Sequence, residues 1–271
     1  MIYDKETSFE EAVITVLKQH GWDDADGVLR YPTEQDLIEN WAKILFQNNA
    51  DIDRLNGCPL TQGEMAQVIE QIETLKTPLA LNGFINGKTV AITRDNPNDP
   101  LHLGKEVSLK IYDRQEIAAG QSRYQIAQQP IYPAKNKILN DRRGDLCLLI
   151  NGMPVIHIEL KRSGIPVSQA TGQIEKYAHE GVFTGLFRLV QIFVGMTPDE
   201  ALYFANPGTG AFNSNFYFHW EDFNNEPICA GDKPGTGEWK RFTSSMLSIP
   251  MAHQLIGFYT VADSSDGCLK V

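Results

Sequence analysis

The sequence predicts an α/β domain in which a central mixed β-sheet is flanked by helices. Capping signals and helical periodicity dominate residues 1–76, and short apolar runs bounded by turn residues, typical of strands, recur over 77–223. A Gly/Pro-rich loop and terminal helices occupy 224–271. At 271 residues and 30.4 kDa, the chain can bury a sizeable core as one large domain or two small ones.

The first segment is expected to be mostly helical. Its pattern predicts one helix over residues 6–20 and an acidic, mostly helical stretch from Thr33 to Leu75. Within that stretch, Thr61 is followed three residues later by Glu64. This spacing is a capping box, which predicts that a helix opens there and runs to Leu75.

Strands are expected on both sides of a central hairpin. The predicted strands are Thr77–Asn82, Lys88–Thr93, Glu106–Ile111, Tyr124–Gln128, Leu189–Gly195, Leu202–Ala205 and Asn215–Trp220. Between the first two, Gly83–Thr89 resembles a phosphate-binding loop, but only three residues separate its glycines. We interpret it as a hairpin turn. Near the C-terminus, a loop over Asn224–Gly237 precedes terminal helices, and Pro250 is expected to start the second of them.

The central hairpin spans Asp145 to Lys161, with the sequence DLCLLINGMPVIHIELK. Asn151-Gly152 separates two apolar runs and is a strong signal for a tight turn, because both residues accept a positive φ. The turn brings Asp145 back beside Glu159. Side chains alternate along a strand, so the second strand directs Glu159 and Lys161, together with His157, to one face.

The position of the first acid depends on the register of this hairpin. A strict two-residue turn would pair Asp145 with Ile158 and would direct it to the opposite face from Glu159. We therefore predict a bulge or a longer loop around Asn151 to Pro154, where the proline cannot donate a ladder hydrogen bond.

Two carboxylates and an amine at the end of a buried strand are costly unless a cation and solvent are admitted. Oxygen ligands of this kind hold Mg²⁺, while Lys161 can orient or deprotonate an attacking water and offset charge that develops on phosphorus. Arg142, Arg143 and Arg162 supply positive charge for a phosphate backbone. The sequence therefore predicts a metal-dependent nuclease site. The alternative is an edge hairpin with a solvated Glu-Lys pair.

A further helix is predicted from about Pro166 to His179. Gln169, Gln173 and Tyr177 fall on one of its faces, and Ala170, Ile174 and Ala178 form its apolar stripe. Gln173 and Tyr177 either face solvent or line the floor of the cleft, where they would hydrogen-bond a nucleotide phosphate or the lysine. His157 is expected to be a wall of the cleft rather than a metal ligand.

The run RRGDLCLLINGMPVIHIELKRSG, followed by QATGQIEKY, resembles the PD-(D/E)xK nuclease core with its trailing Q-x-x-x-Y motif. The closest pattern is the version at the N-terminus of the motor and cleavage (R) subunit of type I restriction-modification enzymes. The opening helix from Phe9 to Trp22 and the segments Tyr203–Asn206 and Phe216–Asn225 are also similar to that family, so the resemblance covers nearly the whole chain.

The resemblance implies a role for each matched residue. Asp145 and Glu159 would bind Mg²⁺, with Glu10 as the helix glutamate near the metal. Lys161 would be the catalytic lysine, and Gln173 with Tyr177 the Q-x-x-x-Y pair. One departure is Gly144, which stands where the family often has proline and which we expect to loosen the backbone.

The resemblance also implies an activity and its context. The domain would cut double-stranded DNA by Mg²⁺-dependent hydrolysis, in complex with modification and specificity subunits in a bacterial or archaeal cytoplasm. ATP would be used only by motor domains, whose Walker motifs this chain lacks, and the linker to that motor would begin near Asp266–Val271.

Composition agrees with such an enzyme. No apolar run approaches the ~18 residues of a membrane span, and no secretory signal follows Met1. The four cysteines, Cys58, Cys147, Cys229 and Cys268, are widely spaced, as expected for reduced thiols in the cytosol.

The net charge of −10 argues against a free-standing DNA-binding protein. The charge is unevenly distributed, however. Residues 1–60 contain 12 acidic and 5 basic residues, whereas residues 135–191 contain 8 basic and 5 acidic residues. The predicted nuclease core is therefore locally cationic, and the acidic N-terminal segment is expected to face protein or solvent.

Two other functions remain open. The chain could be a stand-alone nuclease of the same fold in repair or defence, which a downstream helicase in the reading frame would exclude. It could also be a catalytically silent interaction domain, which binding of a divalent cation between Asp145 and Glu159 would exclude.

Overall fold

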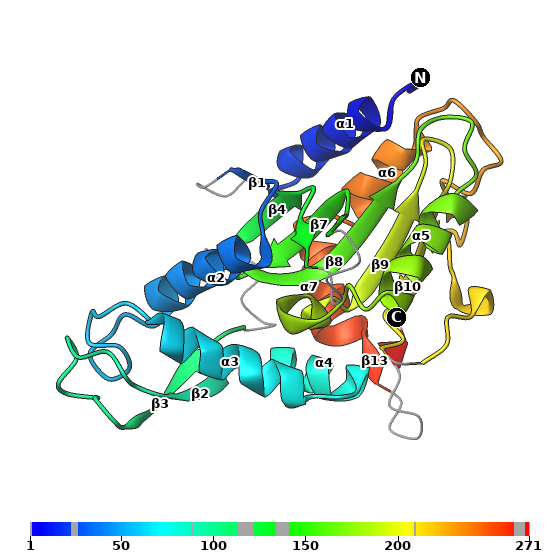
Figure 1. Ribbon diagram of the computed structural model, residues 1–271. Helices are drawn as coiled ribbons and strands as arrows, with labels where there is room; N and C mark the ends of the chain where they lie inside the picture. Colours follow the sequence, from blue (N-terminus) through cyan, green and yellow to red (C-terminus); the bar gives the residue numbers. More distant parts are fainter. Residues whose placement is uncertain are drawn as a thin grey trace.

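The computed structural model describes residues 2–22, 27–87, 89–112, 122–133, 141–208, 210–262 and 269–270. A six-stranded sheet lies at its centre (Figure 1), formed by β1 (Val28–Arg30), β4 (Tyr124–Gln128), β7 (Leu146–Ile150), β8 (Met153–Leu160), β9 (Ile192–Met196) and β10 (Ala201–Ala205). The strands lie side by side in the order β1-β4-β7-β8-β9-β10. The β1–β4 and β8–β9 pairs are parallel and the other pairs antiparallel, so the sheet is mixed, as predicted.

Helices flank this sheet. They are α1 (Glu6–Gln19), α2 (Glu34–Asn48), α3 (Gln62–Thr74), α4 (Pro78–Asn86), α5 (Ser168–His179), α6 (Glu238–Ser245) and α7 (Ile249–Gln254), with 3₁₀ turns η1 (Gly185–Leu189) and η2 (Ser214–Phe216) and a π-helical turn η3 (Leu255–Tyr259). In the view of Figure 1, α1 and α6 lie above the strands, and α3 and α4 lie below them. Every residue of β7 and β8 is buried, because both faces of these central strands are covered.

The remaining strands form four two-stranded sheets: β2 (Thr89–Thr93) with β3 (Glu106–Lys110), β5 (Ile131–Tyr132) with β6 (Arg142–Arg143), β11 (Trp220–Glu221) with β12 (Pro227–Ile228), and β13 (Val261–Ala262) with β14 (Leu269–Lys270). The β5–β6 pair precedes the central hairpin along the chain. It supplies backbone that the helix α5 contacts at the site described below.

Most of the predicted helices are confirmed. Both α2 and α3 begin with a complete capping box, at Thr33 with Asp36 and at Thr61 with Glu64, and only the second was predicted. Pro250 lies in the first turn of α7, as expected.

The predicted strand Thr77–Asn82 is wrong, because α4 occupies this segment. The side chain of Thr77 accepts a hydrogen bond from the Ala80 amide, and Pro78 fills the first turn, where no amide donor is needed. Leu81 and Ile85, four residues apart, are buried by the helix. The predicted hairpin turn from Gly83 is wrong for the same reason, since this stretch forms the last turn of α4.

Two further strand predictions need correction. Most of Asn215–Trp220 is not a strand, because the 3₁₀ turn η2 occupies its first residues. The Asn213 side chain accepts a hydrogen bond from the backbone amide of Asn215 and so stabilises this turn. Phe218 forms an isolated bridge to Tyr203 of the sheet, and Trp220 belongs to the short strand β11. The predicted strand from Leu189 begins later, because η1 precedes β9. The short strand β1 was not predicted.

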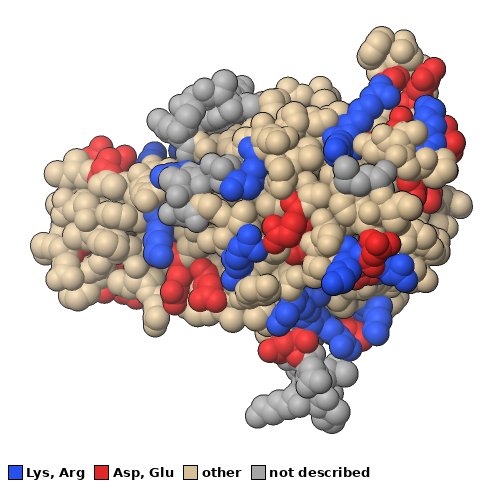
Figure 2. Space-filling view, turned by 90° about the horizontal axis from the view of Figure 1, so that it is seen from above, with Lys and Arg blue, Asp and Glu red and all other residues tan. Residues whose placement is uncertain are grey.

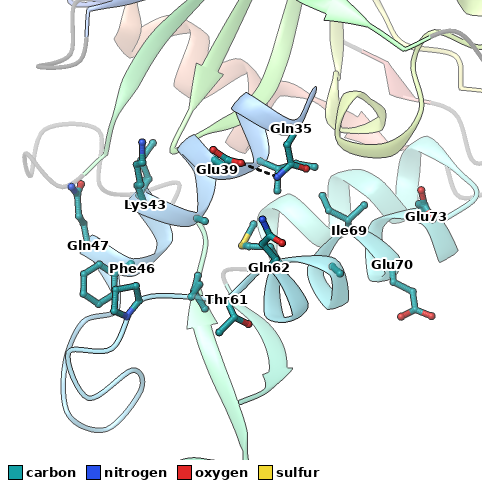
Figure 3. A pocket seen from close by; sticks show the side chains of 17 residues that line it. Gln35, Glu39, Lys43, Phe46, Gln47, Thr61, Gln62, Ile69, Glu70 and Glu73 are labelled. Atoms are coloured by element: carbon teal, nitrogen blue, oxygen red, sulfur yellow. Dashed lines mark hydrogen bonds between the residues drawn. The ribbon is translucent and has the colours of Figure 1, made fainter. Parts of the chain in front are cut away.

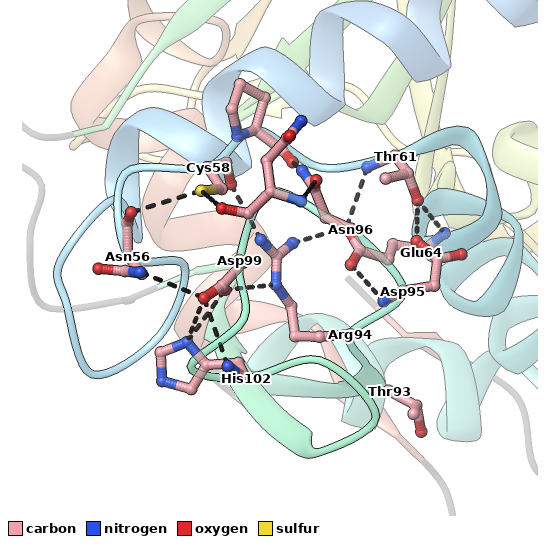
Figure 4. Close-up of polar contacts among 12 residues, drawn as sticks. Asn56, Cys58, Thr61, Glu64, Thr93, Arg94, Asp95, Asn96, Asp99 and His102 are labelled. Carbon is pink, nitrogen blue, oxygen red and sulfur yellow. Dashed lines mark hydrogen bonds and ion pairs between the residues drawn. The ribbon is translucent and has the colours of Figure 1, made fainter.

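A buried ion-pair cluster joins α3 to the β2–β3 hairpin (Figure 4). The Arg94 guanidinium lies 2.7 Å from Glu64 Oε2 and 3.1 Å from Asp99 Oδ2, and all three side chains are inaccessible to solvent. Glu64 also accepts a hydrogen bond from the backbone amide of Asp95, and the His102 ring lies within hydrogen-bond distance of the Asp99 carboxylate. Because every charge has a partner, this cluster is a structural connection between the hairpin and the helix.

No described helix has both the length and the apolar character needed to cross a membrane. Cys58, Cys147 and Cys229 are free thiols. Cys268 lies outside the described residues, as does most of the expected linker over 266–271.

Candidate active site

The register of the β7–β8 hairpin confirms the predicted irregularity. Asn151 and Gly152 have φ values of 51° and 84°, and Ile150 pairs with Met153 across the turn. Leu149 then pairs with Pro154, but Leu148 pairs with Ile156, so one extra residue, Val155, lies on β8 immediately after the predicted segment. This bulge shifts every later pair by one residue.

The shift directs the two acids to the same face of the sheet, at the end where β7 begins and β8 ends. Leu146 pairs with Ile158, so the next position along the ladder sets Asp145 against Glu159. The Leu160 amide donates a hydrogen bond of 2.7 Å to Asp145 Oδ2, which holds the aspartate against the end of β8. The register that the prediction requires is therefore present, and the metal site itself stays a prediction.

Glu159 is fully buried. Neither of its carboxylate oxygens accepts a well-aligned hydrogen bond from any residue that the structure describes, and the carboxylate lies against Asp145 and His157. Burial raises the pKa of Glu159 to about 8, although the positive charge of Lys161 opposes this rise. Burial also raises the pKa of Asp145 well above its ordinary value, and the charge on Glu159 raises it further. Without a cation, both shifts therefore favour a protonated form of the pair.

Lys161 lies directly beyond β8 and is nearly buried. Its ammonium donates a hydrogen bond of 3.0 Å to the Leu160 carbonyl and lies 3.8 Å from Glu6 Oε1. Its charge lowers the pKa of both Asp145 and Glu159, so it interacts electrostatically with both acids.

Glu10, on the buried face of α1, lies near this pair but is held by other groups. Its carboxylate accepts hydrogen bonds from the side-chain amides of Gln128 and Gln129, at the end of β4. Burial raises the pKa of Glu10, and the charge on Asp145 contributes to the rise. Among the described residues, no group of three or more His, Cys, Asp or Glu side chains could hold a metal ion.

The Q-x-x-x-Y pair lies on α5. Gln173 donates a hydrogen bond of 2.8 Å to the Tyr177 hydroxyl, which donates one of 2.9 Å to the Arg143 carbonyl of β6. Burial and the charge on Glu159 raise the pKa of Tyr177 to about 12, so its hydroxyl remains a donor. Through these two hydrogen bonds, the pair connects α5 to β6, the strand that directly precedes Gly144 and Asp145.

The three arginines have different surroundings. Arg142 forms a two-pronged ion pair with Glu180, with distances of 2.6 and 2.9 Å. The exposed Arg143 guanidinium stacks over the Tyr31 ring at 5.5 Å, and Arg162 is exposed. Figure 2 shows Lys and Arg side chains in separate groups with acidic side chains among them, so this face carries mixed charge.

Sequence reasoning missed a buried pair behind the acids. The Tyr132 hydroxyl lies 2.7 Å from His157 Nδ1, and His157 Nε2 lies 3.1 Å from Glu159 Oε1 without hydrogen-bond alignment. Burial lowers the pKa of His157 to about 4, so the ring is neutral at neutral pH. The neutral His157 ring therefore packs beside Glu159 as part of the buried lining of the site. The alternation of β8 placed it on the correct face, but nothing in the sequence pointed to Tyr132.

This pair explains Gly144 differently from our expectation. A Cβ at Gly144 would lie 2.7 Å from the His157 ring and 2.8 Å from the Tyr132 ring, so glycine provides space for them rather than a looser backbone.

Gly144→Ala should destabilise the domain by about 1–3 kcal/mol, because the added methyl group overpacks a site with no room to relax. Urea unfolding measures this change. The matched control is Gly172→Ala in α5, where a Cβ meets nothing within 4 Å and where alanine should stabilise by roughly 0.5–1 kcal/mol. Equal effects of the two substitutions would contradict the close packing at Gly144.

The fold and the site together describe an α/β domain with a buried glutamate, a partly buried aspartate and a lysine at the end of a mixed sheet. Residues 3–212 match the family described as the N terminus of the type I restriction enzyme R protein, so the chain belongs to this family.

Individual relatives agree. The chain is 28% identical over 269 residues to a type I restriction enzyme endonuclease subunit of Staphylococcus saprophyticus, and 26% identical over 273 residues to one of Staphylococcus aureus; each alignment covers 99% of this chain and 26% of the relative. A third, the EcoprrI endonuclease subunit of Escherichia coli, is 31% identical over 130 residues, which are 47% of this chain and 39% of the relative. The chain thus spans about a quarter of the length of the staphylococcal relatives.

Proposed function

We propose that this chain is a Mg²⁺-dependent endonuclease domain that hydrolyses phosphodiester bonds of double-stranded DNA as part of a type I restriction enzyme endonuclease subunit. The observation that carries the proposal is the buried Glu159 carboxylate, which lies against Asp145 and has no well-aligned hydrogen-bond donor among the described residues. A buried carboxylate without partners is strongly disfavoured unless it holds a proton or a cation.

The residues present fit Mg²⁺. Asp145 and Glu159 would bind it, and two protein carboxylates suit an ion that usually keeps several waters. When bound, the ion would supply a water of lowered pKa and Lewis-acid stabilisation of the phosphate. Glu10 would contribute negative charge from the adjacent helix, and its direct ligation remains a prediction.

The other side chains have distinct proposed roles. Lys161 would orient the attacking water and offset charge on the phosphate in the transition state. Gln173 and Tyr177 would hold the backbone before Asp145 in place. Arg143 and Arg162, both exposed, would contact the DNA backbone, while Arg142 would first have to leave its ion pair with Glu180.

The proposed context follows from the family. Relatives are named endonuclease subunits of type I restriction enzymes. We propose double-stranded DNA and modification and specificity subunits as partners, with ATP consumed by motor domains outside this stretch.

Thermal unfolding with added Mg²⁺ or Mn²⁺ tests metal binding. The wild type should gain about 2.7 kcal/mol of stability at a free ion concentration of a hundred times Kd, because the ion binds only the folded site. Glu159→Ala should lose this gain, and Glu226→Ala, which removes an exposed acid elsewhere, should keep it. A wild type that gains no stability from either ion would favour the catalytically silent alternative.

A further inference from the structure

A second surface of the domain is a groove between α2 and α3, far along the chain from the acids. It has a volume of about 1140 Å³ and is lined by side chains of both helices (Figure 3). From α2, Ile38, Ala42 and Phe46 follow one another at four-residue spacing, and all three are partly exposed. From α3, Met65 and Ile69 face the same space. The floor of the groove is therefore an apolar stripe.

The rim of this groove is acidic. Glu39, Glu70 and Glu73 are exposed along it, against the single cation Lys43 in the main groove. A smaller hollow of about 520 Å³ shares Ile38, Ile69 and Glu73 with the groove and extends it toward η1. The extension adds one acidic and one basic side chain to the lining, Glu34 and Arg188. The surface thus keeps an excess of negative charge, which repels DNA and attracts basic groups.

We propose that the groove between α2 and α3 binds an amphipathic helix of a protein partner, with an apolar stripe flanked by Lys and Arg residues. The α2 stripe spans nine residues, or ~12 Å along the helix axis, which matches about two turns of a helix lying beside it. Ala42 and Ala66 present small side chains on opposite walls, so a third helix can approach closely. Helices commonly bind such grooves through apolar residues at i, i+4 and i+7.

The negative charge of the groove's rim distinguishes among the possible binding partners. Basic side chains beside the partner's apolar stripe would meet Glu39, Glu70 and Glu73. A second copy of this domain, offering the same acidic rim, would be repelled at low ionic strength. The groove therefore fits a basic helix better than a second copy or a nucleic acid.

The test uses three fluorescent helical peptides of about 18 residues, long enough to form helix in isolation. The first carries leucines at i, i+4, i+7 and i+11 with lysines beside them. The second has the same composition with the leucines distributed around the helix, and the third has glutamate in place of lysine. Fluorescence anisotropy should show that only the first binds the wild-type domain tightly, and that added salt weakens this binding.

Substitutions then locate the binding surface. Ala42→Arg and Ala66→Arg, at accessible helical positions on opposite walls, should each weaken binding at least about tenfold. The double substitution Glu70→Lys and Glu73→Lys should weaken binding by about tenfold at low salt and reduce its salt dependence. The matched controls Ala211→Arg and Glu226→Lys, in exposed loops, should bind as the wild type does. Circular dichroism and melting confirm that each variant is folded.

Equal binding of the first two peptides would overturn the proposal, because it would show charge attraction alone. Equal binding of the lysine and glutamate peptides would overturn the assigned partner chemistry. Wild-type affinity in both Ala42→Arg and Ala66→Arg would place the peptide elsewhere. If analytical ultracentrifugation showed a dimer of the wild-type domain that Ala42→Arg dissociates, a second copy would be the occupant of the groove. This result would also overturn the proposal.

Discussion

Replacing Lys161 by alanine should reduce DNA cleavage by about 10³-fold or more while leaving divalent-ion binding largely intact. The expected loss is that of a charged group positioned for the transition state in a site of low dielectric. Lys161 provides no ligand for a cation, so the carboxylates of Asp145 and Glu159 remain available. Two opposing effects act on ion binding: the acids lose a positive neighbour that lowers their pKa, and the bound ion loses a like charge.

Plasmid nicking by the domain within its full subunit assembly measures the first effect, and calorimetric titration with Mn²⁺ measures the second. Lys176→Ala, which removes an exposed lysine from α5, is the control and should cut at the wild-type rate. Glu159→Ala should lose both cleavage and ion binding. Cutting by Lys161→Ala at the wild-type rate would show that the amine has no part in the chemistry.

The affinity for a divalent ion should rise steeply with pH. Because burial raises the pKa of Glu159 to about 8, an ion must displace a proton at lower pH. Release of one proton predicts a Kd that falls about tenfold per pH unit well below pH 8, and about fiftyfold in all between pH 6 and pH 8. Calorimetry in two buffers of different ionisation enthalpy counts the protons released. A Kd independent of pH would contradict a protonated carboxylate pair.

Stability without metal should change in the opposite direction. The folded-state pKa of Glu159 lies above its unfolded value, so the folded protein binds more protons between about pH 4.5 and pH 8. The domain should therefore lose stability as pH rises through this range, by an amount on the order of a few kcal/mol. Glu159→Gln has no such proton and should flatten the profile in urea unfolding. Identical profiles for wild type and Glu159→Gln would contradict the raised pKa.

Asp145 is a less suitable position for this comparison. Its Oδ2 accepts the Leu160 amide, so Asp145→Ala removes a hydrogen bond as well as a charge. The backbone amide left behind would be unpaired, which typically costs about 1–3 kcal/mol. Asp145→Asn keeps an acceptor oxygen and is the better substitution.

Local signals were enough to predict several elements. The capping box at Thr61, the Asn151-Gly152 turn and the alternation along β8 each depend on residues a few positions apart. The bulge could also be predicted, since the acids can share a cation only if the register shifts by one residue. Thr77 with Pro78 was also a helix-start signal, but the apolar residues that follow were interpreted as a strand.

The contacts that surround the acids could not be predicted in this way. Gln128 and Gln129 reach Glu10 across more than a hundred residues of chain, and Tyr132 reaches His157 from a separate two-stranded sheet. Neither contact has a local sequence pattern, because the partners come together only when the sheet and its helices pack. The ion pair of Arg142 with Glu180 arises in the same way.

By itself, the sequence determined the α/β class, the hairpin with its acids and lysine, and the segment of the chain that carries them. These features depend on short-range periodicity and turn chemistry. Only the tertiary structure decided that Glu159 is buried without a well-aligned donor among the described residues, that Gly144 makes room for two rings, and that α2 and α3 enclose an acidic groove. Burial and the pairing of distant groups set these properties, and both are consequences of packing rather than of local sequence.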